Sequence, residues 1–171
     1  PPPPPPPPNF FFNAQDATPD AQESRGLGDV YKRQGELRGL SKQKVDSFMS
    51  QFEDFFNGEI LGGKKYLRDL SKGNQKKAGI VAALMGEPKV IILDEPFANL
   101  DPTTQIRLKK IIKDLSNYKD TTILISSHDI QDVTEVCERI VLLEKGELIR
   151  DINTSEETLK ELEEYFKARI N

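Results

Sequence analysis

The segment Lys89–Pro96 constrains the fold more than any other part of this sequence, because a short apolar run ends in two adjacent carboxylates. Val90–Leu93 shows no polar alternation, which is typical of a strand buried on both faces in a parallel sheet under helices. Burial of unpaired charge is costly, so Asp94 and Glu95 must meet a cation, a solvated cleft or both. Because ligands bind at the carboxyl ends of parallel strands, this segment predicts a metal-phosphate site.

Length and composition restrict the class of protein. The 171 residues are enough for one domain and a smaller appended piece, and no apolar run is long enough to cross a bilayer. The formal charge of −4 argues against a non-specific nucleic-acid binder, so no nucleic-acid partner is expected. The single cysteine, Cys137, excludes an internal disulfide framework, and its place on an apolar helix side predicts a buried thiol.

The first part of the sequence does not have the texture of a domain. A proline homopolymer, Pro1–Pro8, precedes three phenylalanines and a polar stretch without periodicity. Asp29–Gln34 resembles the translation of a transposase end sequence that is used to tag DNA fragments. We therefore expect residues 1–34 to be a disordered or artefactual segment and exclude them from the fold prediction. The alternative is a genuine proline-rich arm that docks a partner.

Beyond this segment, apolar periodicity predicts helices over residues 35–86. Ser41 caps a helix whose apolar residues recur at steps of three and four. Ser71 caps a second helix, which ends before Gly86. These helices predict a helical subdomain. The apolar stripe of the first helix consists of Val45, Phe48, Met49, Phe52, Phe55 and Phe56.

Residues 87–171 are predicted to form half of an α/β core. After the first strand, Asp101 caps a helix that has Pro102 at its first position. A second apolar strand covers residues 121–126, and a strand, a helix and a strand in this order form a parallel pair with a right-handed crossover. The remaining predicted elements are a helix near 130–138, a strand, turn and strand over 140–150, and a last helix with a capping box at Thr154 and Glu157.

The predicted crossover brings the only histidine of the chain next to the two acids. Asp94 and Glu95 end the first strand, and His128 follows the second. The carboxyl ends of paired parallel strands meet at one edge of the sheet, so we expect the three side chains to converge on one crevice. A lone histidine is usually a satisfied surface or core residue, but its convergence with two carboxylates favours a functional role.

The start of the second helix is a candidate anion site. Ser71 by itself would be only a helix cap, and the same holds for Asp101 at the next helix. Helix starts also offer free backbone N–H groups and the positive end of the helix dipole. Lys72, Gly73 and Asn74 add a cation, a closely approachable backbone and an amide donor, which favours phosphate binding.

Gly58–Lys65 nearly satisfies the phosphate-loop pattern, but its context argues against that function. Lys65 occupies the position of the hydroxyl that would hold magnesium. The motif also needs a preceding strand, whereas an amphipathic helix is predicted here. We therefore reject this segment as the nucleotide loop.

Four of these motifs together resemble those of the ATP-binding cassette (ABC) ATPase family, over nearly all of the chain from Gly35 onward. The resemblance implies an α/β fold: a partial P-loop NTPase of the ABC type, with a parallel core sheet flanked by helices and an α-helical signature subdomain. Leu70–Asn74 is similar to the signature sequence, Val90–Glu95 to the Walker B strand, Ala98–Asp101 to the D-loop and His128 to the switch histidine.

The departures from the family pattern are also informative. Lys72 and Asn74 replace a glycine and a glutamine of the common signature, a variant similar to that of cassettes paired with separate permeases. No Walker A loop and no Q-loop are found, because proline and apparent adapter sequence fill the upstream region. The resemblance therefore implies an N-terminally truncated ATP-binding subunit that is inactive as an isolated chain.

The resemblance also implies roles for the candidate residues, with ATP and Mg²⁺ as cofactors. Asp94 would hold Mg²⁺, Glu95 would be the catalytic glutamate, and His128 would contact the γ-phosphate. The partners implied are a second ABC ATPase subunit in a head-to-tail dimer and an integral membrane permease. The residues that would act across the dimer are Ser71, Lys72, Gly73 and Asn74 at the partner's ATP, and Asp101 between the two sites.

The implied location is cytoplasmic, peripheral on the inner face of the cell membrane. Two other classes stay open from the sequence. One is a soluble ABC ATPase acting in DNA repair or translation, although no long coiled-coil insertion or second cassette is visible. The other is a non-catalytic binding fragment.

Overall fold

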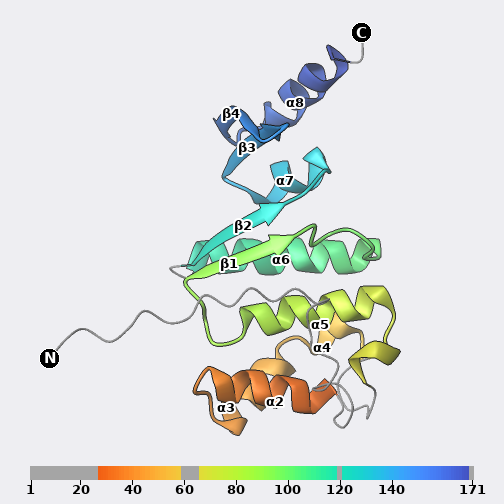
Figure 1. Ribbon diagram of the computed structural model, residues 1–171, viewed down its shortest axis with the longest axis vertical. Coiled ribbons are helices and arrows are strands. Elements are labelled where there is room, and N and C mark those ends of the chain that lie inside the picture. Colours follow the sequence, from red (N-terminus) through yellow and green to blue (C-terminus); the bar gives the residue numbers. More distant parts are fainter. Residues whose placement is uncertain (1–26, 59–65, 119–120, 170–171) are drawn as a thin grey trace, which may run out of the picture. The chain divides into compact units, whose positions relative to one another are not determined.

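The computed structural model describes residues 27–58, 66–118 and 121–169, and the chain divides into two compact units between Pro88 and Lys89. Figure 1 shows helices in the first unit and a mixture of strands and helices in the second. The predicted boundaries at residues 35 and 87 stay predictions. None of the described helices is long and apolar enough to cross a bilayer.

The regular elements of the first unit are helical over its described residues. Val81 and Met85 are fully buried, the first in the longest helix of this unit and the second directly after it. The elements are α2 (Leu27–Leu37), α3 (Lys42–Ser50), α4 (Glu53–Phe56), the 3₁₀ helix η1 (Leu67–Asp69) and α5 (Lys72–Leu84).

Helix α2 begins before the boundary that the sequence predicts. Its Tyr31 is buried, and the Tyr31 hydroxyl donates to the carbonyl of Ala78 in α5 at 3.2 Å. Residues 27–34 of the segment excluded above therefore form part of a packed helix. Residues 1–26 lie outside the described residues, and the assignment of residues 1–34 as non-native stays a prediction.

The aromatic helix predicted after Ser41 is divided in two. The Ser41 hydroxyl accepts from the backbone N–H of Lys44, which confirms the predicted cap. The chain leaves the helix at Phe52, whose φ is −104°, and re-enters it for α4. Phe55 and Phe56 are both buried in α4, so tertiary packing of aromatic rings overrides the helical periodicity.

The second unit alternates strands and helices. The helix between its first two strands, α6, carries the fully buried Leu108 and the buried Ile112. The elements are β1 (Val90–Asp94), α6 (Pro102–Tyr118), β2 (Thr122–Ser126), α7 (Ile130–Val136), β3 (Arg139–Glu144), β4 (Glu147–Asn153) and α8 (Thr158–Lys167).

Strands β1 and β2 form the predicted parallel pair. Their register runs from Val90 opposite Thr122 to Asp94 opposite Ser126, with α6 as the crossover. Figure 1 shows α6 running alongside both strands. The register matters for function because it sets the ends of the two strands next to each other.

The prediction that β1 is buried on both faces is wrong for the described residues. Ile91 and Leu93 are buried, whereas Val90 is 62 % exposed and Ile92 is 50 % exposed. The burial therefore alternates along the strand, because helix packing covers only one face of the pair. An uninterrupted apolar run cannot distinguish between these two situations.

Strands β3 and β4 form the predicted antiparallel hairpin, and α8 follows it. Its turn has Lys145 at φ 51° and Gly146 at φ 84°, the left-handed pair that two-residue hairpin turns require. The predicted capping box at Thr154 and Glu157 is wrong. Instead, the hydroxyl of Thr158 accepts from the backbone N–H of Ser155 at 2.8 Å, so the helix begins later.

Candidate functional site

The ends of β1 and β2 bring the predicted acids and the histidine together. Asp94 and Ser126 are register partners, Glu95 follows β1, and His128 lies two residues beyond β2. The Nδ1 atom of His128 lies 2.8 Å from Oε1 of Glu95. This contact confirms the predicted approach of Glu95 and His128, while the Asp94 carboxylate accepts from the Ser126 hydroxyl.

Ser126 connects the two strand ends, and sequence reasoning did not select it as a site residue. Its hydroxyl donates to Oδ1 of Asp94 and accepts from the backbone N–H of Glu95, the latter at 3.1 Å. The same N–H also donates to the Ser126 carbonyl at 3.1 Å. The strand register could have identified Ser126, because two paired five-residue parallel strands place the last residue of β2 opposite Asp94.

Glu95 has a left-handed backbone, with φ at 46°. This region is uncommon for residues other than glycine, asparagine and aspartate, and such strained residues cluster at active sites. The turn directs the chain away from the strand immediately after Asp94. Hydrogen bonds from the Glu95 backbone N–H to Ser126 hold the strained residue in place.

The electrostatics of the cluster centre on His128. The hydrogen bond to Glu95 and the charge of Glu95 raise the pKa of His128 above its ordinary value, and Asp129 and Asp132 contribute more weakly. The imidazole is 80 % exposed, so water screens these interactions. The ring therefore holds its proton to a higher pH than a free histidine does, and the protonated ring donates to Glu95.

The turn that carries His128 is fixed by a helix cap. Asp129 is the N-cap of α7, and its Oδ1 accepts from the backbone N–H of Gln131 at 2.9 Å. The Ser127 hydroxyl accepts from the backbone N–H of Asp129 at 3.1 Å. Both neighbours of His128 are thus held by local hydrogen bonds, which limits the directions that the imidazole can take.

The candidate anion site lies at the start of α5, in the first unit. The Ser71 hydroxyl accepts from the backbone N–H of Asn74 at 3.2 Å, which confirms the predicted cap. Ser71 and Lys72 are exposed, and Gly73 and Asn74 are partly exposed. The first turn of α5 therefore faces solvent, and the positive end of a helix dipole attracts anions.

Asp101 caps α6, as the sequence predicts. Its Oδ1 accepts from the backbone N–H of Thr104 at 3.0 Å, and its Oδ2 accepts from the Thr104 hydroxyl at 2.5 Å. Thr104 is fully buried, while Asp101 is exposed. The carboxylate is thus held rigidly at the surface of the second unit.

The oxygen ligands at the strand ends fit magnesium. The described residues contain no cluster of three or more histidine, cysteine or acidic side chains that could hold a metal by themselves. Mg²⁺ is typically bound by one or two carboxylates together with water and substrate phosphates. Asp94, an exposed carboxylate beside the Ser126 hydroxyl, matches this donor set.

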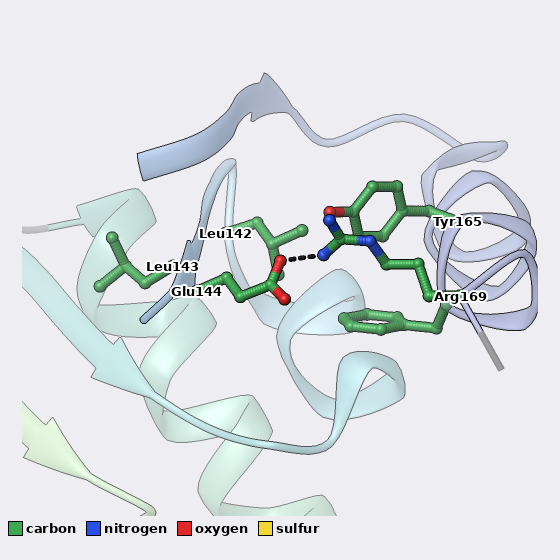
Figure 2. Close-up of a pocket in the computed structure, with 6 residues that line it drawn as sticks. Leu142, Leu143, Glu144, Tyr165 and Arg169 are labelled. Atoms are coloured by element: carbon green, nitrogen blue, oxygen red, sulfur yellow. Dashed lines mark hydrogen bonds and ion pairs between the residues drawn. The ribbon is translucent and has the colours of Figure 1, made fainter. Parts of the chain in front are cut away.

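A hollow of about 360 Å³ lies between β3 and α8. Figure 2 shows Arg169 paired with Glu144 across this hollow, beside the ring of Tyr165. The Arg169 guanidinium carbon lies 4.9 Å from the centre of the Tyr165 ring, a cation–π distance. These contacts attach α8 to the hairpin, and none of the residues predicted for the site lines the hollow.

Known proteins with similar sequences also indicate the family of this chain. A family model described as "AAA domain, putative AbiEii toxin, Type IV TA system" matches residues 9–131. An uncharacterized ABC transporter ATP-binding protein of Methanocaldococcus jannaschii is 33 % identical over 135 residues, covering 74 % of this chain and 50 % of the relative. The bacitracin transport ATP-binding protein of Enterococcus faecalis is 37 % identical over 122 residues, covering 69 % and 37 %.

The chain belongs to the ABC ATPase family. A solved structure described as the ATP-binding subunit of an ABC transporter matches this ABC ATPase chain with a TM-score of 0.70 at 23 % identity, over 84 % of this chain and 57 % of the other. A dimeric ATP-binding cassette bound to ADP and Pi matches at a TM-score of 0.59 and 24 % identity, over 68 % and 50 %. These likenesses confirm the predicted fold class.

The chain spans half or less of the length of the two curated relatives described above, at 50 % and 37 %. The toxin in the family model's description belongs to that model and is not carried over to this ABC ATPase.

Proposed function

We propose that this chain is part of the ATP-binding subunit of an ABC transporter, which hydrolyses ATP and drives a separate membrane permease. The observation that carries the proposal is the 2.8 Å contact between His128 and Glu95 at the paired ends of two parallel strands. A carboxylate and an imidazole next to a potential magnesium ligand form a constellation suited to phosphoryl transfer. The names of the two curated relatives support the transporter class.

Glu95 is the residue that acts on the attacking water. Its carboxylate accepts a proton or orients the water, which is the role of a general base. Hydrogen bonds from its backbone N–H to Ser126 hold the strained backbone of Glu95, and its carboxylate contacts His128. Such preorganisation lowers the cost of reaching the reactive geometry.

His128 and Asp94 act on the charge of the triphosphate. The imidazole of His128 donates to the γ-phosphate, and its contact with Glu95 makes the ring responsive to the loss of that phosphate. Asp94 would hold Mg²⁺, and the ion would supply charge neutralisation on the triphosphate.

The start of α5 acts on the ATP of a second subunit. Ser71, Lys72, Gly73 and Asn74 offer a hydroxyl, an ammonium group and backbone N–H donors at a helix N-terminus, which is suited to a γ-phosphate. Asp101 lies at the dimer interface and couples the two sites. The description of the matched cassette as dimeric supports pairing with a second subunit.

The subunit acts on the cytoplasmic side, peripheral to the inner face of the cell membrane, where ATP is present. Its partner there is an integral membrane permease, and opening of the dimer after hydrolysis moves the permease between its two states. The transport systems named for the curated relatives support this assignment.

ATP hydrolysis by a joined cassette tests the proposal. This sequence contains no glycine-rich loop with the lysine and hydroxyl of the phosphate-loop pattern. We define the joined cassette as this chain from Leu27 onward, which keeps helix α2 whole, fused behind the N-terminal half of an intact ABC ATPase that carries the phosphate-loop pattern. We expect Mg²⁺-dependent hydrolysis that falls on the order of 100-fold or more in Glu95→Gln, since a general base contributes about 10²–10⁴ in rate.

Glu138→Gln is the matched control, because it removes an exposed carboxylate outside the strand ends. We expect this variant to retain the parent rate. Equal rates for the parent and Glu95→Gln joined cassettes, with both proteins folded, would overturn the proposed role of Glu95.

A further inference from the structure

Lys109 of α6 joins this helix to α7. Its Nζ atom lies 2.8 Å from Oδ1 of Asp132 and 2.6 Å from Oε2 of Glu135, both on α7. The Lys109 side chain is only 17 % exposed, and that of Asp132 is 13 % exposed. One partly buried ammonium group therefore binds two carboxylates one helical turn apart, which fixes α7 both along and across α6.

The same helix also holds the chain that follows Glu95. Lys109 Nζ lies 5.8 Å from the centre of the Phe97 ring, and Gln105 donates from Nε2 to the Phe97 carbonyl at 3.0 Å. Phe97 is buried, so it is a firm point of attachment. We call Asp94, Glu95, Ser126 and His128 the strand-end cluster. Lys109 thus contacts Phe97, which follows Glu95 in the chain, and helix α7, which follows His128.

The connection from α7 to His128 is short. Asp129 caps α7 by accepting from the backbone N–H of Gln131, and His128 is the residue before this cap. A rotation or shift of α7 therefore moves the His128 turn with it. Within the described part of the chain, the exposed imidazole forms no other hydrogen bond or ion pair that would hold it near Glu95 if α7 moved.

We propose that Lys109 is a positioning residue, which holds α7 so that His128 stays in contact with Glu95. This inference rests on the proposed function for its consequence, which is that ATP hydrolysis depends on Lys109 through His128. The contact itself is a property of the fold and can be measured without nucleotide.

Electrostatics favour a permanent link. Burial acts to lower the pKa of Lys109, but the hydrogen bonds and charges of Asp132 and Glu135 outweigh it and raise the pKa. The hydrogen bond to Lys109 lowers the pKa of Glu135. Lys109 and Glu135 therefore both stay charged near neutral pH, and the ion pair between them does not switch off.

The direction in which the pKa of His128 changes on replacement of Lys109 shows whether the imidazole has moved or only a nearby charge has been lost. Loss of a nearby cation raises the pKa of a histidine, and release of the Asp132 and Glu135 carboxylates would raise it further. Loss of the His128–Glu95 contact has the opposite effect, because that contact is the largest cause of the raised pKa. A fall in the pKa of His128 therefore reports displacement of the imidazole from Glu95.

Nuclear magnetic resonance of the full chain provides the test, since the chain has a single histidine and its ring signals are unambiguous. In Lys109→Met, we expect loss of the nuclear Overhauser contact between the His128 ring and the Glu95 side chain. We also expect the pKa of His128 to fall toward about 6.5. Lys109→Arg should retain both signals, because a guanidinium can bind the same two carboxylates.

Lys110→Met is the control, because it removes an exposed charge from the neighbouring position on α6. It should leave the Overhauser contact and the pKa unchanged. An intact contact in a folded Lys109→Met protein, or a raised pKa, would overturn the inference. If Lys109→Met does not fold, Lys109→Gln takes its place; if neither folds, Lys109 supports the core rather than the His128 turn, and the inference fails. The ATP hydrolysis of the joined cassette tests the proposed function separately.

Discussion

The backbone N–H of Glu95 donates to both the carbonyl oxygen and the hydroxyl of Ser126, each at 3.1 Å. One residue at the end of β2 therefore fixes the turn that follows β1. The same hydroxyl donates to Asp94, so Ser126 contacts both acids of the strand-end cluster. The Asp94 carboxylate and the Glu95 backbone are thus both held by one residue of the neighbouring strand.

Replacement of Ser126 by alanine tests this dependence. We expect Ser126→Ala to lower the free energy of unfolding by about 1 kcal/mol, because it removes a donor to Asp94 and an acceptor for Glu95. Urea denaturation of the full chain measures the change. Ser116→Ala is the control, since the exposed Ser116 hydroxyl donates only within α6, at 3.4 Å to Lys113. An equal loss in both variants would contradict the account.

The His128–Glu95 contact predicts a particular dependence of stability on pH. Because the folded pKa of His128 is raised, the contact stabilises the fold below the unfolded pKa of about 6.5 and loses its effect as the pH rises through the folded pKa. We expect the parent chain to exceed Glu95→Gln in urea midpoint just below about pH 6.5. Above the folded pKa this difference should vanish, and a difference that grows with pH would exclude the contact as its source.

The convergence at the strand ends followed from the sequence because it depends only on topology. A strand, a helix and a strand form a parallel pair, and parallel pairs align their carboxyl ends. Glu95 and His128 could therefore be placed together without knowledge of any side-chain contact. The caps at Ser71 and Asp101 were equally predictable, since a cap is a local hydrogen bond within a few residues.

Features that depend on tertiary packing were not predictable from the same patterns. The division between α3 and α4 arises from burial of Phe55 and Phe56, which the helical period cannot anticipate. Exposure of Ile92 depends on which elements cover the sheet, not on the apolar character of the strand. The capping box at Thr154 failed because Ser155 hydrogen-bonds to Thr158 instead.

A negative charge at position 71 separates the role of Ser71 as a helix cap from its proposed role in phosphate binding. Ser71→Ala should cost about 1 kcal/mol in unfolding free energy, because the N-cap acceptor is lost. Ser71→Asp should retain the stability, since aspartate is a good N-cap and its charge suits the helix dipole. The added carboxylate should nevertheless prevent ATP-dependent dimerisation of the joined cassette by repelling a phosphate. Dimerisation of Ser71→Asp equal to that of the parent would show that the start of α5 binds no phosphate.

The central claim is that Glu95 drives hydrolysis of ATP that is shared between two subunits. The most direct measurement is the molar mass of the Glu95→Gln joined cassette by light scattering, in Mg²⁺ with either ATP or ADP. Because the variant cannot remove the γ-phosphate, the account predicts a stable dimer with ATP and a monomer with ADP. A monomer with both nucleotides, from a protein that is folded and binds ATP, would contradict it.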